Sequence, residues 1–196
     1  MNNRHAVIAA TLLIGSIAST SLRAQAADTA ARWSLLVPSG TMVPTGAQSH
    51  AVKRGNVTAI QISYAPRSTF AITSTFGWAR SRDVATAGDP KLDVFTYDVG
   101  AEARAPQWLQ GKGVELTPFV GAGAGGRSYN YRNLDVDATH NVAGYLSAGG
   151  EARVRRIGIR LEARDYLTSF KPLNGSGDTR SGNDVVVMAG LRIFSR

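Results

Sequence analysis

The residue types that most often carry enzymatic chemistry are sparse in this chain. It has no cysteine, which excludes thiol catalysis, cysteine-bound zinc and disulfide bonds. His50 and His140 are the only histidines after residue 26. A serine nucleophile needs a histidine within reach, and Ser128 and Ser147 are the candidates by residue type alone. No recognised motif joins either serine to a histidine, so we expect no catalytic residues and no enzyme activity.

Two further segments match ligand-binding patterns by composition. Gly121–Gly126 fits the G-x-G-x-x-G pattern, which cradles a pyrophosphate only where a helix follows. Here Arg127–Tyr131 follows and alternates as a strand, so we interpret the glycines as bare backbone against which bulky side chains pack. Asp135, Asp137 and His140 cluster in one polar segment, which we interpret as a solvated loop. The sequence therefore predicts no metal and no cofactor.

These residues belong to a chain that alternates polar and apolar side chains, with the two-residue period of a β-strand. In Ile157–Arg164 every charge falls on one face and every large apolar side chain on the other. The same alternation recurs in Asp93–Arg104, Val142–Val154 and Asp184–Phe194. We predict eight strands near residues 31–37, 56–65, 69–80, 92–104, 113–131, 140–154, 157–170 and 183–194.

The predicted connections alternate between short and long. The short ones are residues 66–68, 105–112 and 155–156, and the longer, polar ones are residues 38–55, 81–91, 132–139 and 171–182. Short turns at one end and long loops at the other are typical of barrels that cross an outer membrane, whose strands need roughly 9–11 residues. The predicted fold is all-β, an eight-stranded antiparallel up-and-down transmembrane β-barrel.

The N-terminus is typical of an export signal. A basic start at Arg4 leads into an apolar run over residues 6–18 and then into Ala24-Gln-Ala26, a small-x-small cleavage site. This run is shorter than the roughly 20 residues of a spanning helix. We expect residues 1–26 to be a signal peptide and residues 27–196 to form one barrel domain.

Alternation alone does not say which face of the barrel is apolar, but two features favour the outside. The apolar faces are thin, with pairs such as Ala101 and Ala103 that would fill a dry core poorly. Lysine, common on solvated surfaces, is confined after residue 26 to the predicted loops and turns. An apolar outside facing lipid accounts for both features.

The polar face then forms the lumen, and it carries arginine and glutamate at mid-strand. With both termini on the periplasmic side, we expect a lumen charge network of Glu102, Arg104, Glu115, Glu151, Arg153, Arg160, Glu162 and Arg192. A buried charge is costly unless it is paired, so acids should face bases. Phe119, Tyr129, Tyr145 and Tyr166 also point inward by parity, and we predict no open aqueous pore.

Aromatic and basic residues gather where the predicted strands end. We expect Trp33, Tyr64 and Trp108 near the periplasmic rim and Trp78 and Tyr131 near the outer rim. The net charge of +8 does not indicate nucleic acid, because no basic run contains interleaved aromatics. The anionic partner we expect is lipopolysaccharide, contacted near the outer rim by Arg80, Arg82, Lys91, Arg132 and Lys171.

Three segments carry a resemblance to a known family: Leu116–Gly126, Arg160–Tyr166 and the terminal Leu191–Phe194. Together with the hairpin rhythm of residues 27–196, they resemble the small eight-stranded outer-membrane β-barrels, the OmpA/OmpX/OmpW-like group. The resemblance implies a porin-like protein of the Gram-negative outer membrane that serves envelope integrity, surface adhesion or lipid and small-solute handling. It also implies recognition by the barrel-insertion machinery through the terminal aromatic strand; here Ser195 and Arg196 follow Phe194.

Three functions are therefore open. The first is a non-enzymatic integral outer-membrane barrel with a plugged polar lumen, in contact with outer-membrane lipid and an extracellular partner that the sequence does not identify. The second is a soluble exported lipocalin-like barrel, apolar inside, that binds a small hydrophobic ligand. The third is a barrel enzyme that modifies lipid A through a serine and a histidine.

Overall fold

The computed structural model describes residues 32–195 apart from 106–108, 112, 133 and 171–179. Its elements are β1 (Arg32–Thr45), η1 (Gly46–His50), β2 (Gly55–Arg67), β3 (Phe70–Arg82), β4 (Lys91–Arg104), β5 (Leu109–Gly111), β6 (Val114–Tyr131), β7 (Thr139–Val154), β8 (Ile157–Phe170) and β9 (Arg180–Phe194). The expected signal peptide, Trp108 and Lys171 lie outside the described residues. No helix in the described part of the chain is long and apolar enough to cross a membrane.

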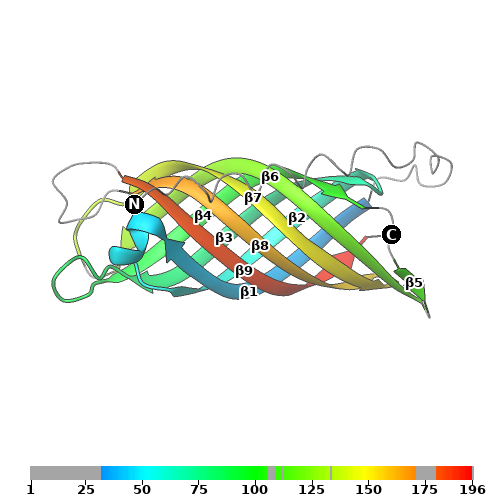
Figure 1. The fold of residues 1–196 in the computed structure, drawn as a ribbon, viewed down its shortest axis with the longest axis horizontal. Coiled ribbons are helices and arrows are strands. Elements are labelled where there is room, and N and C mark those ends of the chain that lie inside the picture. Colours follow the sequence, from blue (N-terminus) through cyan, green and yellow to red (C-terminus); the bar gives the residue numbers. More distant parts are fainter. Residues whose placement is uncertain (1–31, 106–108, 112, 133, 171–179, 196) are drawn as a thin grey trace, which may run out of the picture.

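Eight of these strands close into a barrel. Each long strand pairs antiparallel with the next long strand in sequence, β1 pairs with β9, and β4 pairs with β6. Figure 1 shows the strands tilted around a common axis, with η1 at one end and the start of β1, the end of β9 and β5 at the other. We call these the loop end and the termini end. The predicted all-β, eight-stranded antiparallel up-and-down barrel is confirmed.

The predicted break after Val37 is wrong. β1 continues through Pro38 and Gly40 to Thr45, where a long loop was expected from residue 38. Proline lacks the backbone N–H, and the ladder to β2 skips Val37 and Pro38 while the ladder to β9 continues past them. Gly40 is held close to its partner strand, because an added Cβ would lie 1.9 Å from the Val187 carbonyl oxygen. Continuous pairing with β9 is thus enough to keep β1 a strand through Pro38 and Gly40.

The termini end contains an element that alternation did not predict. β5 (Leu109–Gly111) lies within the segment expected to be a turn and pairs with the first residues of β6. It adds a short ribbon beyond the closed wall (Figure 1). Three residues are too few to establish a period of two, so the sequence carried no strand signal there.

The apolar face points outward, as the sequence predicted. Large apolar side chains on the outer wall are strongly exposed, including Val142 at 81%, Leu146 at 65% and Ile159 at 61%. Arg160, Arg164 and Arg192, in contrast, are at most 1% exposed inside the barrel. The four inward aromatics that parity predicted, Phe119, Tyr129, Tyr145 and Tyr166, are likewise buried.

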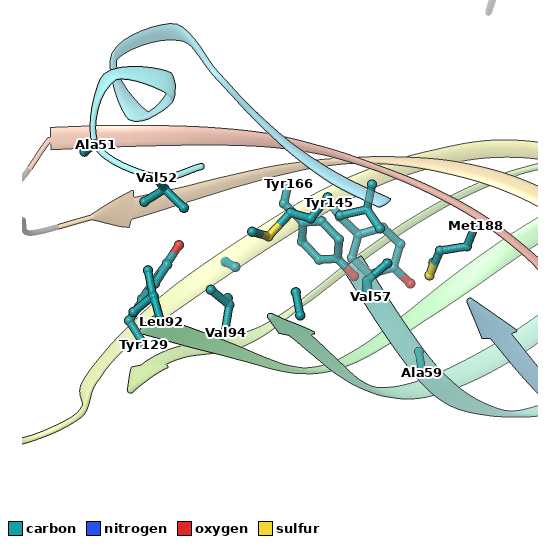
Figure 2. Close-up of a cluster of buried hydrophobic side chains, with 14 of the residues drawn as sticks. Ala51, Val52, Val57, Ala59, Leu92, Val94, Tyr129, Tyr145, Tyr166 and Met188 are labelled. Carbon is teal, nitrogen blue, oxygen red and sulfur yellow. The ribbon is translucent and has the colours of Figure 1, made fainter. Parts of the chain in front are cut away.

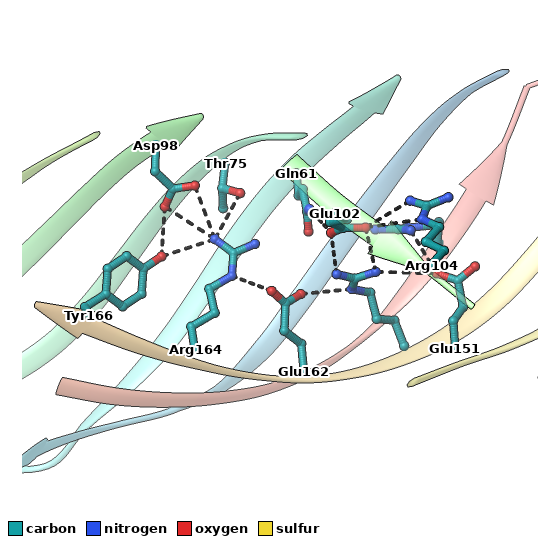
Figure 3. Close-up of polar contacts among 11 residues, drawn as sticks. Gln61, Thr75, Asp98, Glu102, Arg104, Glu151, Glu162, Arg164 and Tyr166 are labelled. Atoms are coloured by element: carbon teal, nitrogen blue, oxygen red, sulfur yellow. Dashed lines mark hydrogen bonds and ion pairs between the residues drawn. The ribbon is translucent and has the colours of Figure 1, made fainter. Parts of the chain in front are cut away.

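The interior of the barrel is apolar toward one end of its axis and charged toward the other. Toward the loop end it holds an apolar cluster that includes Met42, Val52, Leu92, Val94 and Tyr129, each at most 1% exposed (Figure 2). Toward the termini end it is occupied by charged side chains (Figure 3). A polar lumen was expected throughout, so the apolar half is a difference from the sequence analysis.

Candidate functional site: the charged interior of the barrel

Four guanidinium groups and four carboxylates fill the charged half of the interior. Arg160, from β8, is at the centre: its Nη2 lies 2.5 Å from Glu102 Oε1 and its Nε lies 2.9 Å from Glu162 Oε2. Arg104 Nη2 reaches the other oxygen of Glu102 at 3.0 Å. Gln61 donates to Glu102 from β2 at 3.3 Å. Strands on opposite sides of the barrel are thereby joined through side chains (Figure 3).

The chain of contacts continues along β8 toward the loop end. Arg164 Nε lies 2.5 Å from Glu162 Oε1, and Arg164 Nη1 lies 3.2 Å from Asp98 Oδ1. The Tyr166 hydroxyl donates to Asp98 Oδ2 at 2.8 Å, and Thr75 contacts the same guanidinium at 3.2 Å. Residues two apart on one strand share a face, so a single strand supplies Arg160, Glu162, Arg164 and Tyr166.

Arg192 and Glu151 extend the contacts around the wall. Arg192 Nη1, from β9, lies 2.9 Å from Glu151 Oε2, and the same oxygen lies 3.9 Å from Arg160 Nη1. Glu151 is in register with Arg160 across β7 and β8. We refer to Asp98, Glu102, Arg104, Glu151, Arg160, Glu162, Arg164 and Arg192 as the lumen network. Its formal charges cancel, as burial requires.

A separate ion pair lies between the lumen network and η1. Arg127, from β6, contacts Asp184, from β9, and both side chains are at most 2% exposed. The Arg127 guanidinium also lies 4.3 Å from the centroid of the Tyr166 ring. Gln48, from η1, reaches down from the loop end, with Nε2 3.4 Å from both Asp184 Oδ2 and the Tyr129 hydroxyl. The 3-10 turn is therefore tied to the interior of the barrel.

The structure brings together six of the eight residues expected in the lumen: Glu102, Arg104, Glu151, Arg160, Glu162 and Arg192. Glu115 and Arg153 face one another in the register of β6 and β7 but are partly exposed near the termini end. Arg153 lies over the Phe194 ring at 4.0 Å and donates to the Arg155 carbonyl. Neither is joined to the lumen network by any contact that the described residues make.

Sequence reasoning missed Asp98, Arg164, Arg127 and Asp184. Parity already puts all four on inner faces, so the signal was present. The expectation stopped at the periplasmic half of the lumen, whereas the long arginine side chains carry the contacts toward the loop end. Parity applied to every charged residue along the lumen, and not only to those of the periplasmic half, identifies these four residues.

The remaining candidates are placed as follows. Gly121–Gly126 lies within β6, which continues as a strand to Tyr131. An added Cβ on Gly123 would lie 2.5 Å from Tyr145 Cε1, consistent with glycines that accept a bulky interior ring. Ser128 and His140 are register partners on the outer face of β6 and β7 near the loop end, and the structure gives no hydrogen bond between their side chains. Within the described residues no group of three potential metal ligands occurs.

The barrel has the fold of small outer-membrane proteins. It superimposes on Neisserial surface protein A with a TM-score of 0.60 and 10% identity, over 84% of this chain and 98% of that one. The N-terminal β-barrel domain of Pseudomonas aeruginosa OprF gives a TM-score of 0.50 and 12% identity, over 84% of this chain and 97% of that one. No protein-family model matches the chain, and a search of the curated proteins finds no relative. The fold is thus that of the small eight-stranded outer-membrane barrels, as the sequence resemblance predicted.

Proposed function

We propose that this protein is a non-enzymatic integral barrel of the outer membrane, with a lumen plugged by its own side chains, that serves envelope integrity or surface interaction. The observation that carries the proposal is the inverted distribution of side chains. Exposed Leu, Ile and Val cover the outer wall while arginine and glutamate fill the inside. Water would penalise that outer wall, whereas lipid tails accept it.

The aromatic residues support the same orientation. Trp33 and Tyr64 pack against each other on the outer wall at the termini end, with tilted rings whose centroids lie 4.9 Å apart. Trp78 and Phe95 stack toward the loop end at 6.3 Å. Two aromatic positions separated along the barrel axis match the two interfaces of a bilayer. The short turns then face the periplasm, and η1 and the longer connections face outside.

A plugged lumen is supported by the side chains on the axis. An eight-stranded barrel is only wide enough to be filled by its own side chains. Here the lumen network spans the termini-end half, and Arg127, Asp184, Gln48 and the apolar cluster follow toward the loop end. Solute passage along the axis would require separating paired charges that have no bulk water to receive them.

The experiment that tests the membrane assignment is electrophoretic mobility with and without boiling, after the chain is refolded into detergent. We expect a heat-modifiable band, together with extraction from cell membranes by detergent but not by high salt. A monomer that stays soluble and folded without detergent would contradict the proposal. That outcome would favour the lipocalin-like alternative, which requires the faces to be reversed.

The enzyme alternative has one observation in its favour. The register puts Ser128, which is buried, opposite the exposed His140 at outward positions close to the expected membrane surface. A nucleophile and its base must share a hydrogen bond, and a third group normally orients the base. The structure gives neither for this pair. We therefore expect no release of fatty acid from lipid A by the folded barrel. Release that disappears in Ser128→Ala would replace the non-enzymatic proposal.

A further inference from the structure

A row of cationic residues crosses four neighbouring chain segments at the loop end. Arg82 ends β3 and is in register with Lys91, the first residue of β4. The Lys53 amide donates to the Arg82 carbonyl, and the Arg132 amide donates to the Lys91 carbonyl. Neighbouring strands lie about 4.8 Å apart, so the row extends over roughly 15 Å. Lys53, Arg82 and Lys91 are exposed and Arg132 is half-buried.

Below this row, the outer wall changes from basic to aromatic to apolar. The next outward pair toward the termini end consists of Arg80, which is exposed, and Asp93. The next outward pair is Trp78 and Phe95, and the one below it is Phe76 and Tyr97. Successive outward residues on a strand are about 7 Å apart. Charge, aromatic rings and apolar surface therefore follow one another at the depths of lipid phosphates, headgroup boundary and acyl chains.

The aromatic and basic layers are in contact. The Arg80 guanidinium lies 4.0 Å from the centroid of the Trp78 ring, which stacks on Phe95 at 6.3 Å. Phe95 in turn lies 6.2 Å from Phe76. Stacking on an aromatic ring leaves the edge N–H groups of a guanidinium free to bind an anion. Arg80 is thereby held on the outer wall between the cationic row and the membrane.

Only one carboxylate of this sector forms an ion pair with its cations among the described residues. Asp89, Asp135 and Asp137 are exposed in the adjoining connections and form none with them. Asp93 pairs with Arg132 at 2.9 Å. Asp83 is fully buried, where it accepts hydrogen bonds from Tyr131 and from the turn at Ala85 and Thr86. Lys53, Arg80, Arg82 and Lys91 have no carboxylate partner among the described residues. A concentration of unpaired cations at one place on the rim indicates an anionic partner.

Most of the loop-end cations among the described residues lie on this side of the barrel, although Arg180, the first residue of β9, is also at the loop end. The loop-end residues of β1 (41–45) and of β7 (139–142) contain no lysine or arginine. We call the group of cations in the sector formed by β2, β3, β4 and β6 the rim site.

We propose that the rim site binds the phosphate groups of a multiply phosphorylated lipid seated in the outer leaflet beside β3 and β4, with Arg80, Arg82 and Lys91 as the principal contacts. The proposal rests on the proposed membrane orientation and adds to it a ligand class, a sector and named residues. A lipid is the source of the phosphate because the cations stand directly above an aromatic and apolar wall. A soluble polyanion bound to these cations would not contact Trp78, Phe95 and Phe76, which lie on the membrane side of the cations.

The test is a calorimetric titration of the barrel, folded in zwitterionic detergent, with bisphosphorylated lipid A and with its dephosphorylated form. The rim variant Arg80→Gln/Arg82→Gln/Lys91→Gln removes three cations. The matched control Arg67→Gln/Arg155→Gln/Arg156→Gln removes three exposed cations from the turns of the termini end. Each phosphate-facing cation contributes modestly, so we expect the rim variant to bind the bisphosphorylated lipid about tenfold more weakly. The control should stay within about twofold of the unmodified protein.

Three outcomes would overturn the proposal. The rim and control variants could weaken binding equally, the unmodified protein could bind both lipid forms alike, or inorganic phosphate could compete at the concentration of the lipid phosphates. Each protein is first checked for heat-modifiable mobility. An unmodified protein that lacks this behaviour refutes the membrane assignment and the rim site with it. One that folds as a barrel but ignores lipid phosphorylation refutes only the rim site.

Discussion

At the scale of single residues, Arg160 holds the lumen network together. Its guanidinium contacts Glu102 and Glu162, approaches Glu151, and lies 3.4 Å from the centroid of the Phe119 ring. Removing one partner of a buried ion pair costs more than the pair contributes, because the remaining charge stays desolvated. Arg160 is partnered by several carboxylates at once, so its removal should lower the stability of the barrel strongly.

We expect Arg160→Leu to lower the free energy of unfolding by about 3–5 kcal/mol. The measurement is urea unfolding of the barrel in detergent micelles or lipid vesicles. Arg67→Leu, at an exposed turn position, is the control and should change stability by less than about 0.5 kcal/mol. Equal urea midpoints for the two variants would remove the lumen network as a source of stability.

Gly123, on the inner wall, and Gly150, on the outer wall, allow a second comparison. In Gly123→Ala the new Cβ would lie 2.5 Å from both Tyr145 Cε1 and the Val99 carbonyl oxygen. Such overpacking should destabilise the barrel by about 1–3 kcal/mol, measured by the same unfolding experiment. Gly150→Ala is the matched control, since nothing lies within 4 Å of its added Cβ. If both substitutions prove neutral, close packing against Gly123 does not constrain the barrel.

At the scale of elements, η1 is a loop-end segment that packs into the barrel. Gln48 is 3% exposed, and Val52 beyond it is 1% exposed and bridges to Asp83. Proposed to face outside, η1 covers the apolar cluster at the loop end (Figure 2). Gln48 attaches η1 to the interior through two weak hydrogen bonds. The residues that follow η1, Ala51 and Val52, are also buried there.

Gln48→Ala should loosen η1 without unfolding the barrel. Losing a hydrogen-bonding side chain costs about 1 kcal/mol, which corresponds to roughly a fivefold increase in local opening. We expect limited trypsin digestion to cut after Lys53 or Arg54 about five times faster than in the unmodified protein. His50→Ala, at an exposed position of the same turn, should leave the rate unchanged. Identical rates for Gln48→Ala and His50→Ala would mean that Gln48 does not anchor η1.

At the scale of the whole molecule, the proposed plug predicts electrical behaviour. The barrel inserted into a planar lipid bilayer should give no discrete conductance steps, because charged and apolar side chains follow one another along the axis. Stepwise openings that scale with protein concentration would show a continuous aqueous path. Such openings would refute the plugged lumen while leaving the membrane barrel intact.

Much of the fold could be predicted from the sequence, and the exceptions have local causes. Alternation located the strands because side chains on a strand point to opposite faces with a period of two. It failed at Pro38 and Gly40, where pairing to β9 overrides two residues that are poor strand formers. It also failed at β5, which is too short to carry a period. Of the charge network, parity assigned the inward faces of Glu102, Arg160 and Glu162 but not their contacts.

By itself the sequence determined that the chain forms alternating strands with one apolar and one charged face, because that partition is a property of adjacent residues. Only the tertiary structure decided which charges meet. The partner of Arg160 on β4 is 58 positions away in sequence, and its choice depends on strand stagger and on the reach of side chains across the lumen. The same holds for η1, whose burial arises from contacts with β6 and β9 and not from any pattern of its own.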